Sequence, residues 1–79
     1  MQYTVVIEKA QNNYSAYVPD LPGCVTTGAT LEEIKRMIVE AIEFHIEGLL
    51  EDGLPIPEPT TVCQVVEVLS PVKLPTANC

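Results

Sequence analysis

The chain has 79 residues, of which 47% are hydrophobic, and its eleven acidic and four basic side chains give a formal charge of −7. This length allows one small domain, and the mean hydropathy of +0.21 excludes wholesale disorder. No apolar run approaches the roughly 20 residues that cross a bilayer. The first residues carry neither basic side chains nor an apolar stretch typical of export, so we expect a cytoplasmic protein with no membrane partner.

The charge balance restricts the class of partner. Proteins that bind nucleic acid directly cluster Lys and Arg against the phosphates, whereas this chain has only Lys9, Lys35, Arg36 and Lys73. Direct nucleic-acid binding by this chain alone is therefore not expected. An acidic protein is better suited to a basic protein partner, because complementary fields speed the encounter.

Three short strands are predicted before residue 29. Residues 3–8 alternate between two faces and are rich in β-branched side chains. Residues 14–18 follow an Asn-rich turn and read as the second arm of a hairpin. The loop at residues 19–23 ends this strand with Pro22-Gly23, a pair suited to a type II turn. Residues 24–27 form the third strand.

A helix over residues 31–51 is the clearest local prediction. Thr30 followed by Glu33 is a capping box, and Gly53 is well placed to end the helix. The apolar positions follow a helical stripe that we expect to pack on one face of the sheet: Leu31, Ile34, Ile38, Ile42, Ile46 and Leu49.

After the helix, residues 54–59 alternate with proline and favour an extended connector. Residues 61–69 are rich in valine and predict a fourth strand, followed by a tail at residues 70–79. The predicted fold is α+β with the order β-β-β-α-β. A right-handed crossover places the fourth strand beside and parallel to the first, which gives one four-stranded mixed sheet of order 3-2-1-4 with one helix on one face.

Residues that carry chemistry are few and scattered. Cys24, Cys63 and Cys79 match no zinc-ligand spacing, and Cys24 and Cys63 are expected to be buried thiols. His45, the only histidine, falls within the apolar stripe, where packing is its expected role. The strand order resembles the opening half of the ribonuclease H fold, but the first strand lacks the metal-binding acids of that chemistry. We therefore expect that the chain is not an enzyme and that it has no cofactor and no metal site.

The chain resembles the HicB antitoxin family over residues 1–69. The resemblance is carried by residues 3–8, the loop around Pro19-Asp20-Leu21-Pro22-Gly23, the capped helix and the connector. The other single positions that match the family are Tyr17, Val18, Cys24, Gly28, Thr30, Glu33, Ala41, His45, Gly53, Pro57, Glu58 and Pro59. It implies a partial ribonuclease H-like fold without nuclease activity. It also implies a partner, the HicA toxin, a small basic ribonuclease that cleaves messenger RNA and that the antitoxin of this type II toxin-antitoxin system binds and inhibits.

Two features depart from the family. Ala29 stands where an acid often precedes the helix cap, and residues 70–79 show no helical pattern where many members carry a DNA-binding domain. Residues 1–69 are therefore expected to form a HicB-like domain followed by a tail without a DNA-binding domain. The alternatives are an orphan HicB-like oligomeric scaffold or regulator with a different protein partner, and a residual nuclease.

Candidate contact residues lie on three surfaces. The loop residues Asp20, Leu21 and Pro22, together with a helix face opposite the apolar stripe, are candidates for binding the partner; that face carries Glu40, Glu43 and Glu47. The alternative interpretations are that Leu21 covers the core and that the acidic face is only solvated. Met37 and Phe44 flank the apolar stripe and are candidates for a homodimer contact, the alternative being packing under the connector or tail.

Overall fold

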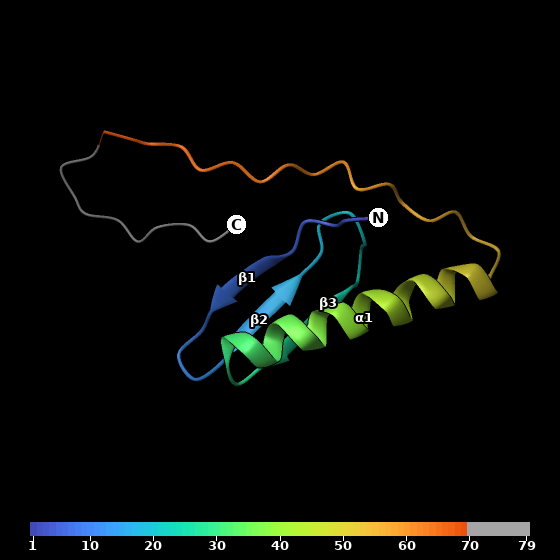
Figure 1. Cartoon of the computed structure of the whole chain (residues 1–79), viewed down its shortest axis with the longest axis horizontal. Coiled ribbons are helices and arrows are strands. Elements are labelled where there is room, and N and C mark those ends of the chain that lie inside the picture. Colours follow the sequence, from blue (N-terminus) through green and yellow to red (C-terminus); the bar gives the residue numbers. More distant parts are fainter. Residues whose placement is uncertain (70–79) are drawn as a thin grey trace.

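The computed structural model of the chain describes residues 1–69. These residues form three strands followed by one helix (Figure 1): β1 (Val6–Lys9), β2 (Tyr14–Tyr17), β3 (Val25–Gly28) and α1 (Leu31–Glu51). The three strands and the helix thus lie where the sequence predicts them, although β1 begins three residues later than expected.

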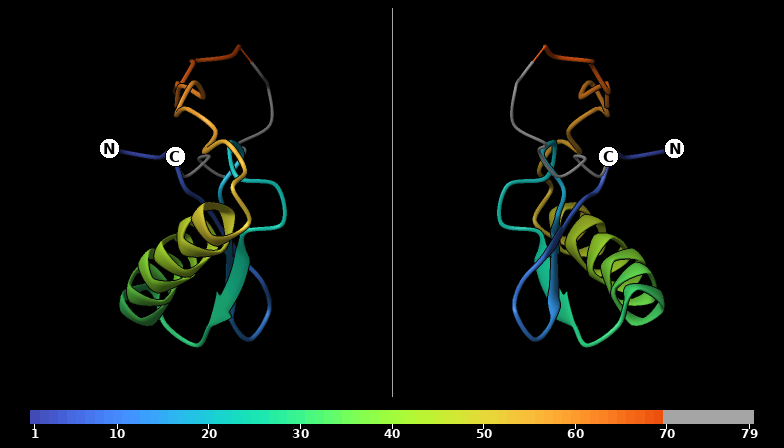
Figure 2. Two further views of the ribbon diagram at one scale, coloured as in Figure 1. Left: turned by 90° about the vertical axis from the view of Figure 1, so that its right-hand side faces the viewer. Right: turned by 90° about the vertical axis from the view of Figure 1, so that its left-hand side faces the viewer.

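The sheet has the order β1-β2-β3, with both neighbouring pairs antiparallel. Ala16 at the centre of β2 lies opposite Ile7 of β1 and Thr26 of β3. Helix α1 covers one face of this sheet (Figure 2), and it contacts β3 and β2 rather than β1. The first strand is therefore both an edge strand and the strand that the helix covers least.

Both ends of α1 are capped by the residues that the sequence indicates. The Oγ1 of Thr30 accepts a hydrogen bond from the Glu33 N–H at 3.1 Å, and the Glu33 carboxylate accepts one from the Ala29 N–H at 3.2 Å. At the other end Gly53 adopts φ +67°, and the Leu54 N–H reaches back to the Leu49 carbonyl at 2.9 Å. This closure is a Schellman motif, in which glycine tolerates the left-handed conformation that turns the chain out of the helix.

The core lies between α1 and the strands β2 and β3. Its buried residues come from the strands, from the loop after β2 and from the helix: Ala16, Val18, Leu21, Cys24, Ile34 and Ile38. Ile42 is partly buried against this cluster, whereas Leu31 is 43% exposed, so its predicted place in the packed stripe is wrong. The packed stripe therefore begins at Ile34.

The predicted fourth strand is wrong. The described residues have the order β-β-β-α, so neither the β-β-β-α-β order nor the four-stranded mixed sheet of order 3-2-1-4 is present in them. Residues 61–69 run extended and apart from the sheet (Figures 1 and 2). The comparison with the ribonuclease H fold depended on that fourth strand, and the predicted tail at residues 70–79 lies outside the described residues.

A physical cause of this difference is visible at Thr61. Its backbone N–H donates to the Asp20 carboxylate at 3.0 Å rather than to a neighbouring strand. Valine-rich composition favours a strand only where a partner edge and a packing surface are present. Composition alone therefore indicated the extended conformation but not the pairing.

Candidate protein-binding surface

The loop between β2 and β3 is closed by three backbone hydrogen bonds. The Val18 N–H donates to the Cys24 carbonyl at 3.2 Å, the Leu21 N–H to the Val18 carbonyl at 3.0 Å and the Cys24 N–H to the Leu21 carbonyl at 3.0 Å. Gly23 has φ +84°, the value that the third position of a type II turn requires. The loop is thus a fixed element rather than a loose connection.

The three loop residues proposed as partner contacts lie in different environments. The Leu21 side chain is fully buried in the core, while Pro22 is exposed and Asp20 is half-buried. Leu21 therefore contributes to the core from within this loop. In this conformation only Pro22 and part of Asp20 offer side-chain surface to a partner.

Asp20 attaches the chain that follows the helix to this loop. Its carboxylate accepts hydrogen bonds from the Thr61 N–H at 3.0 Å, the Thr61 hydroxyl at 2.8 Å and the Thr60 hydroxyl at 3.1 Å. The hydrogen bond from the Thr61 backbone lowers the pKa of Asp20 below its ordinary value, and the two hydroxyls act in the same direction. We call this set of contacts, made by Asp20, Thr60 and Thr61, the Asp20 anchor.

Two further contacts hold the same region to the N-terminal residues. The Tyr3 hydroxyl donates to the Pro57 carbonyl at 2.6 Å, and the Thr4 hydroxyl donates to the Thr61 carbonyl at 3.0 Å. Sequence reasoning missed these contacts, because they join residues 54 to 57 positions apart. The Thr60-Thr61 pair directly after the proline-rich connector was the available signal, since hydroxyls and a free N–H there need acceptors.

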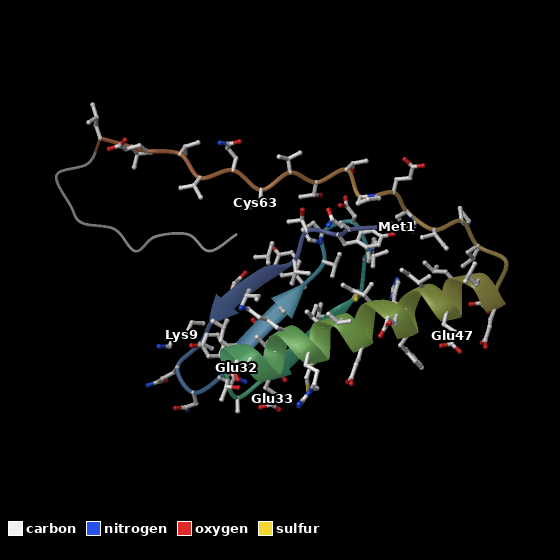
Figure 3. All side chains as sticks on the ribbon, viewed as in Figure 1. Met1, Lys9, Glu32, Glu33, Glu47 and Cys63 are labelled. Atoms are coloured by element: carbon white, nitrogen blue, oxygen red, sulfur yellow. The ribbon has the colours of Figure 1, made fainter. Side chains whose placement is uncertain are left out.

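Glu40, Glu43 and Glu47 all remain exposed on α1. At 100° per residue they fall on the side of the helix opposite Ile38. Glu47 lies in the second half of α1, which extends beyond the strands (Figure 3). Because the whole helix carries six glutamates and only two basic residues, this face forms a negative surface that is open to solvent. We call these three residues the acidic face.

Met37 and Phe44 lie on one flank of α1, between its core side and the acidic face. Met37 is half-buried, and Phe44 is 79% exposed. Packing of Phe44 under residues 54–69 is therefore not observed. An exposed aromatic ring on a small domain is available for contact with another molecule.

A groove of about 700 Å³ lies on the other flank of α1, between the helix and the N-terminal residues. Its helix side is formed by Val39, Ile42, Glu43 and Ile46, and its other side by residues 1–5. The lining is mainly apolar, and Val39 is 54% exposed. We refer to it as the β1-side groove; the sequence analysis did not identify it, because its walls come from distant segments.

The structure offers little for catalysis. Among residues 1–69, no group of three His, Cys, Asp or Glu side chains is placed to hold a metal ion. Burial raises the pKa of the Cys24 thiol, which favours its unreactive protonated form. Cys63, by contrast, is exposed, so its predicted burial is wrong. Within the same residues no helix has both the length and the apolar character needed to cross a membrane.

Residues 3–70 match the sequence model of a family described as the HicB-like antitoxin of a bacterial toxin-antitoxin system. Among solved structures, a chain of a HicA3 and HicB3 toxin-antitoxin complex superposes with a TM-score of 0.67 at 35% identity, covering 76% of this chain and 70% of that one.

Related sequences occur in bacteria, archaea and a phage. An uncharacterized 14.9 kDa protein of Haemophilus phage HP1 is 44% identical over 84% of this chain and 50% of its own length. A UPF0150 protein of Synechocystis is 38% identical over 85% of this chain and 86% of its own. Antitoxin HicB 2 of Photorhabdus laumondii is 33% identical over 77% of this chain and 44% of its own. The chain thus spans about half the length of the phage protein and less than half that of the Photorhabdus antitoxin.

Proposed function

The chain belongs to the HicB-like antitoxin family, and from that premise we propose that it binds and inhibits a HicA-like toxin that cleaves messenger RNA. An antitoxin acts by binding, so membership in this family confirms the prediction that the chain is not an enzyme. The observation that carries the proposal is the structural match, at a TM-score of 0.67, to a chain of a toxin-antitoxin complex.

The acidic face supports the proposal through its charge. A ribonuclease that binds messenger RNA presents basic residues to the phosphates, and a negative helix face is complementary to such a surface. Glu40, Glu43 and Glu47 are exposed, so they can make contact without any change in the core. Each exposed ion pair contributes only about 0–1 kcal/mol, so these glutamates act mainly on the rate of encounter. Asp20 and Pro22 belong to a rigid loop that Leu21 holds in place from the core, and we include the exposed surface of that loop in the contact.

The test measures messenger-RNA cleavage by a purified HicA-like toxin as this chain is added. We expect cleavage to stop at a stoichiometric amount of the chain. The double variant Glu43→Lys with Glu47→Lys should slow association by roughly tenfold or more and weaken its salt dependence. The matched variant Glu8→Lys with Glu58→Lys changes the net charge equally at two other exposed positions and should associate almost at the normal rate.

Cleavage that continues unchanged in excess chain would refute the antitoxin role and favour the orphan scaffold or regulator. Equal slowing in both double variants would show that net charge, rather than the acidic face, governs the encounter.

We also propose that the chain forms a homodimer, with Met37 and Phe44 in the contact. Phe44→Ser should then lower the mass measured by sedimentation without lowering the thermal stability of the fold, because the ring is 79% exposed.

A further inference from the structure

Residues 62–69 form an extended apolar segment that has no partner in the described part of the chain. Within residues 1–69, no hydrogen bond joins this segment to the strands or the helix. Its large apolar side chains are 63% to 104% exposed: Val62, Val65, Val66, Val68 and Leu69. Figure 3 shows the segment, which includes Cys63, running apart from the strands and the helix. We call residues 62–69 the free segment.

The same chain also has an unused strand edge. In the described sheet β1 pairs only with β2, so its other edge presents unpaired backbone groups. Such an edge is a template for another strand unless the fold protects it. At about 3.3 Å per residue, the eight residues of the free segment span roughly 26 Å and the four residues of β1 roughly 13 Å, so half of the segment is long enough to pair with this edge.

We propose that the free segment of one copy adds as a strand to the β1 edge of a second copy, and that the exchange is reciprocal. The Asp20 anchor fixes the chain at Thr61 and directs the following residues off their own sheet. A two-fold pair then matches each free segment with the partner copy's free edge, and such exchange is a low-cost route to a dimer.

The β1-side groove accounts for which face of the added strand turns inward. Alternate residues of a strand share one face, so Val62, Gln64, Val66 and Val68 lie together without a charge, while Glu67 is on the opposite face with Val65. The groove beside β1 is mainly apolar and includes the exposed Val39. The uncharged valine face is therefore the one that fits the groove between α1 and residues 1–5, which directly precede β1.

The exchange uses a surface distinct from Met37 and Phe44, and it meets the acidic face only at Glu43, which also lines the groove. The test is therefore made in full-length Phe44→Ser protein, where association through that flank is removed. Because the exchange and the Phe44 flank are separate contacts, Phe44→Ser should lower the mass only to that of the exchanged pair, and we expect sedimentation to show twice the 8.6 kDa chain mass. Val66→Asp should weaken the dimer by roughly tenfold or more, because it places a charge in an apolar contact. Val65→Asp is the matched control and should leave the dimer almost unchanged.

A second pair of variants tests the groove side. Val39 lines the β1-side groove, and Leu50 is a similarly exposed residue of the same helix outside its lining. Val39→Asp should weaken the dimer, whereas Leu50→Asp should not. Circular dichroism melting checks that each variant is folded before its mass is measured.

The identity of the paired chains is tested in a mixture of two differently isotope-labelled samples. Nuclear Overhauser contacts between residues 62–69 of one label and residues 4–9 of the other are expected. A monomeric mass, equal effects of Val65→Asp and Val66→Asp, or contacts found only within one label would each overturn the exchange. Contacts that form only after addition of a HicA-like toxin would assign the β1 edge or the free segment to that protein instead.

Discussion

Replacement of glycine by alanine should have opposite effects on the stability of the fold at two positions of this chain. A Cβ at Gly28 would lie 3.1 Å from both the N and the Cα of Ile34, whereas a Cβ at Gly48 would have nothing within 4 Å. The atoms near Gly28 belong to the backbone of the first helical turn, so they cannot rotate away as a flexible side chain could. At Gly28, β3 thus passes close to the backbone of α1.

The magnitudes follow from packing and chain entropy. Overpacking of a well-packed site costs about 1–3 kcal/mol, and removing a glycine from the unfolded chain returns about 0.4–1 kcal/mol. Gly28→Ala should therefore destabilise the fold by roughly 0.5–2 kcal/mol. Gly48 lies inside α1, where alanine is favoured over glycine by roughly 0.5–1 kcal/mol, so Gly48→Ala should stabilise it.

Thermal unfolding followed by circular dichroism measures both changes. For a domain of this size, 1 kcal/mol corresponds to about 4–8 °C in Tm, so the two variants should separate by several degrees with the native protein between them. A Gly28→Ala protein that melts at or above the temperature of Gly48→Ala would refute the close approach of β3 and α1.

Three further outcomes are expected. Ile38 is 3% exposed, so Ile38→Ala should lower the free energy of unfolding in urea by about 2–5 kcal/mol. The Thr61 backbone hydrogen bond lowers the pKa of Asp20 from 3.8. The stability that Asp20 contributes is therefore fully present above pH 3.8 and should be lost as the pH falls through the lower pKa of the folded state. Asp20→Asn should abolish this pH dependence of the free energy of unfolding. Maleimide labelling followed by peptide mapping should modify exposed Cys63 quickly and Cys24, buried with a raised pKa, slowly.

The parts of the fold that sequence reasoning recovered are those set by neighbours along the chain. Thr30 and Glu33 are three residues apart, and Pro22 and Gly23 are adjacent, so their roles in the cap and the turn depend on local geometry alone. The helix bounds follow from such local signals, since α1 ends at Glu51 just before Gly53. The order of the first three strands follows as well, because short loops connect antiparallel neighbours.

The parts that were missed depend on contacts between distant residues. The β1-side groove joins residues 1–5 to positions 39–46, and no pattern within either segment indicates the other. Leu31 satisfies the helical stripe but is 43% exposed, because periodicity gives the side of a helix and not how far the sheet extends beneath it. The acidic face could be located from spacing, but its use as a contact surface depends on a second protein.

The Asp20 anchor and the free segment show that a loop can fix the position of a binding segment to which it does not itself belong. A β-rich sequence such as residues 62–69 requires a partner strand, but backbone edges are alike in every chain, so composition cannot name that partner. The chain does specify where the free segment begins, because the Asp20 carboxylate accepts a hydrogen bond from the Thr61 N–H, which is 41 positions away in the sequence. Leu21, the next residue, ties the same loop into the core. A substitution at Asp20 should therefore change the register of any strand that the free segment forms, even where Asp20 does not contact the partner strand.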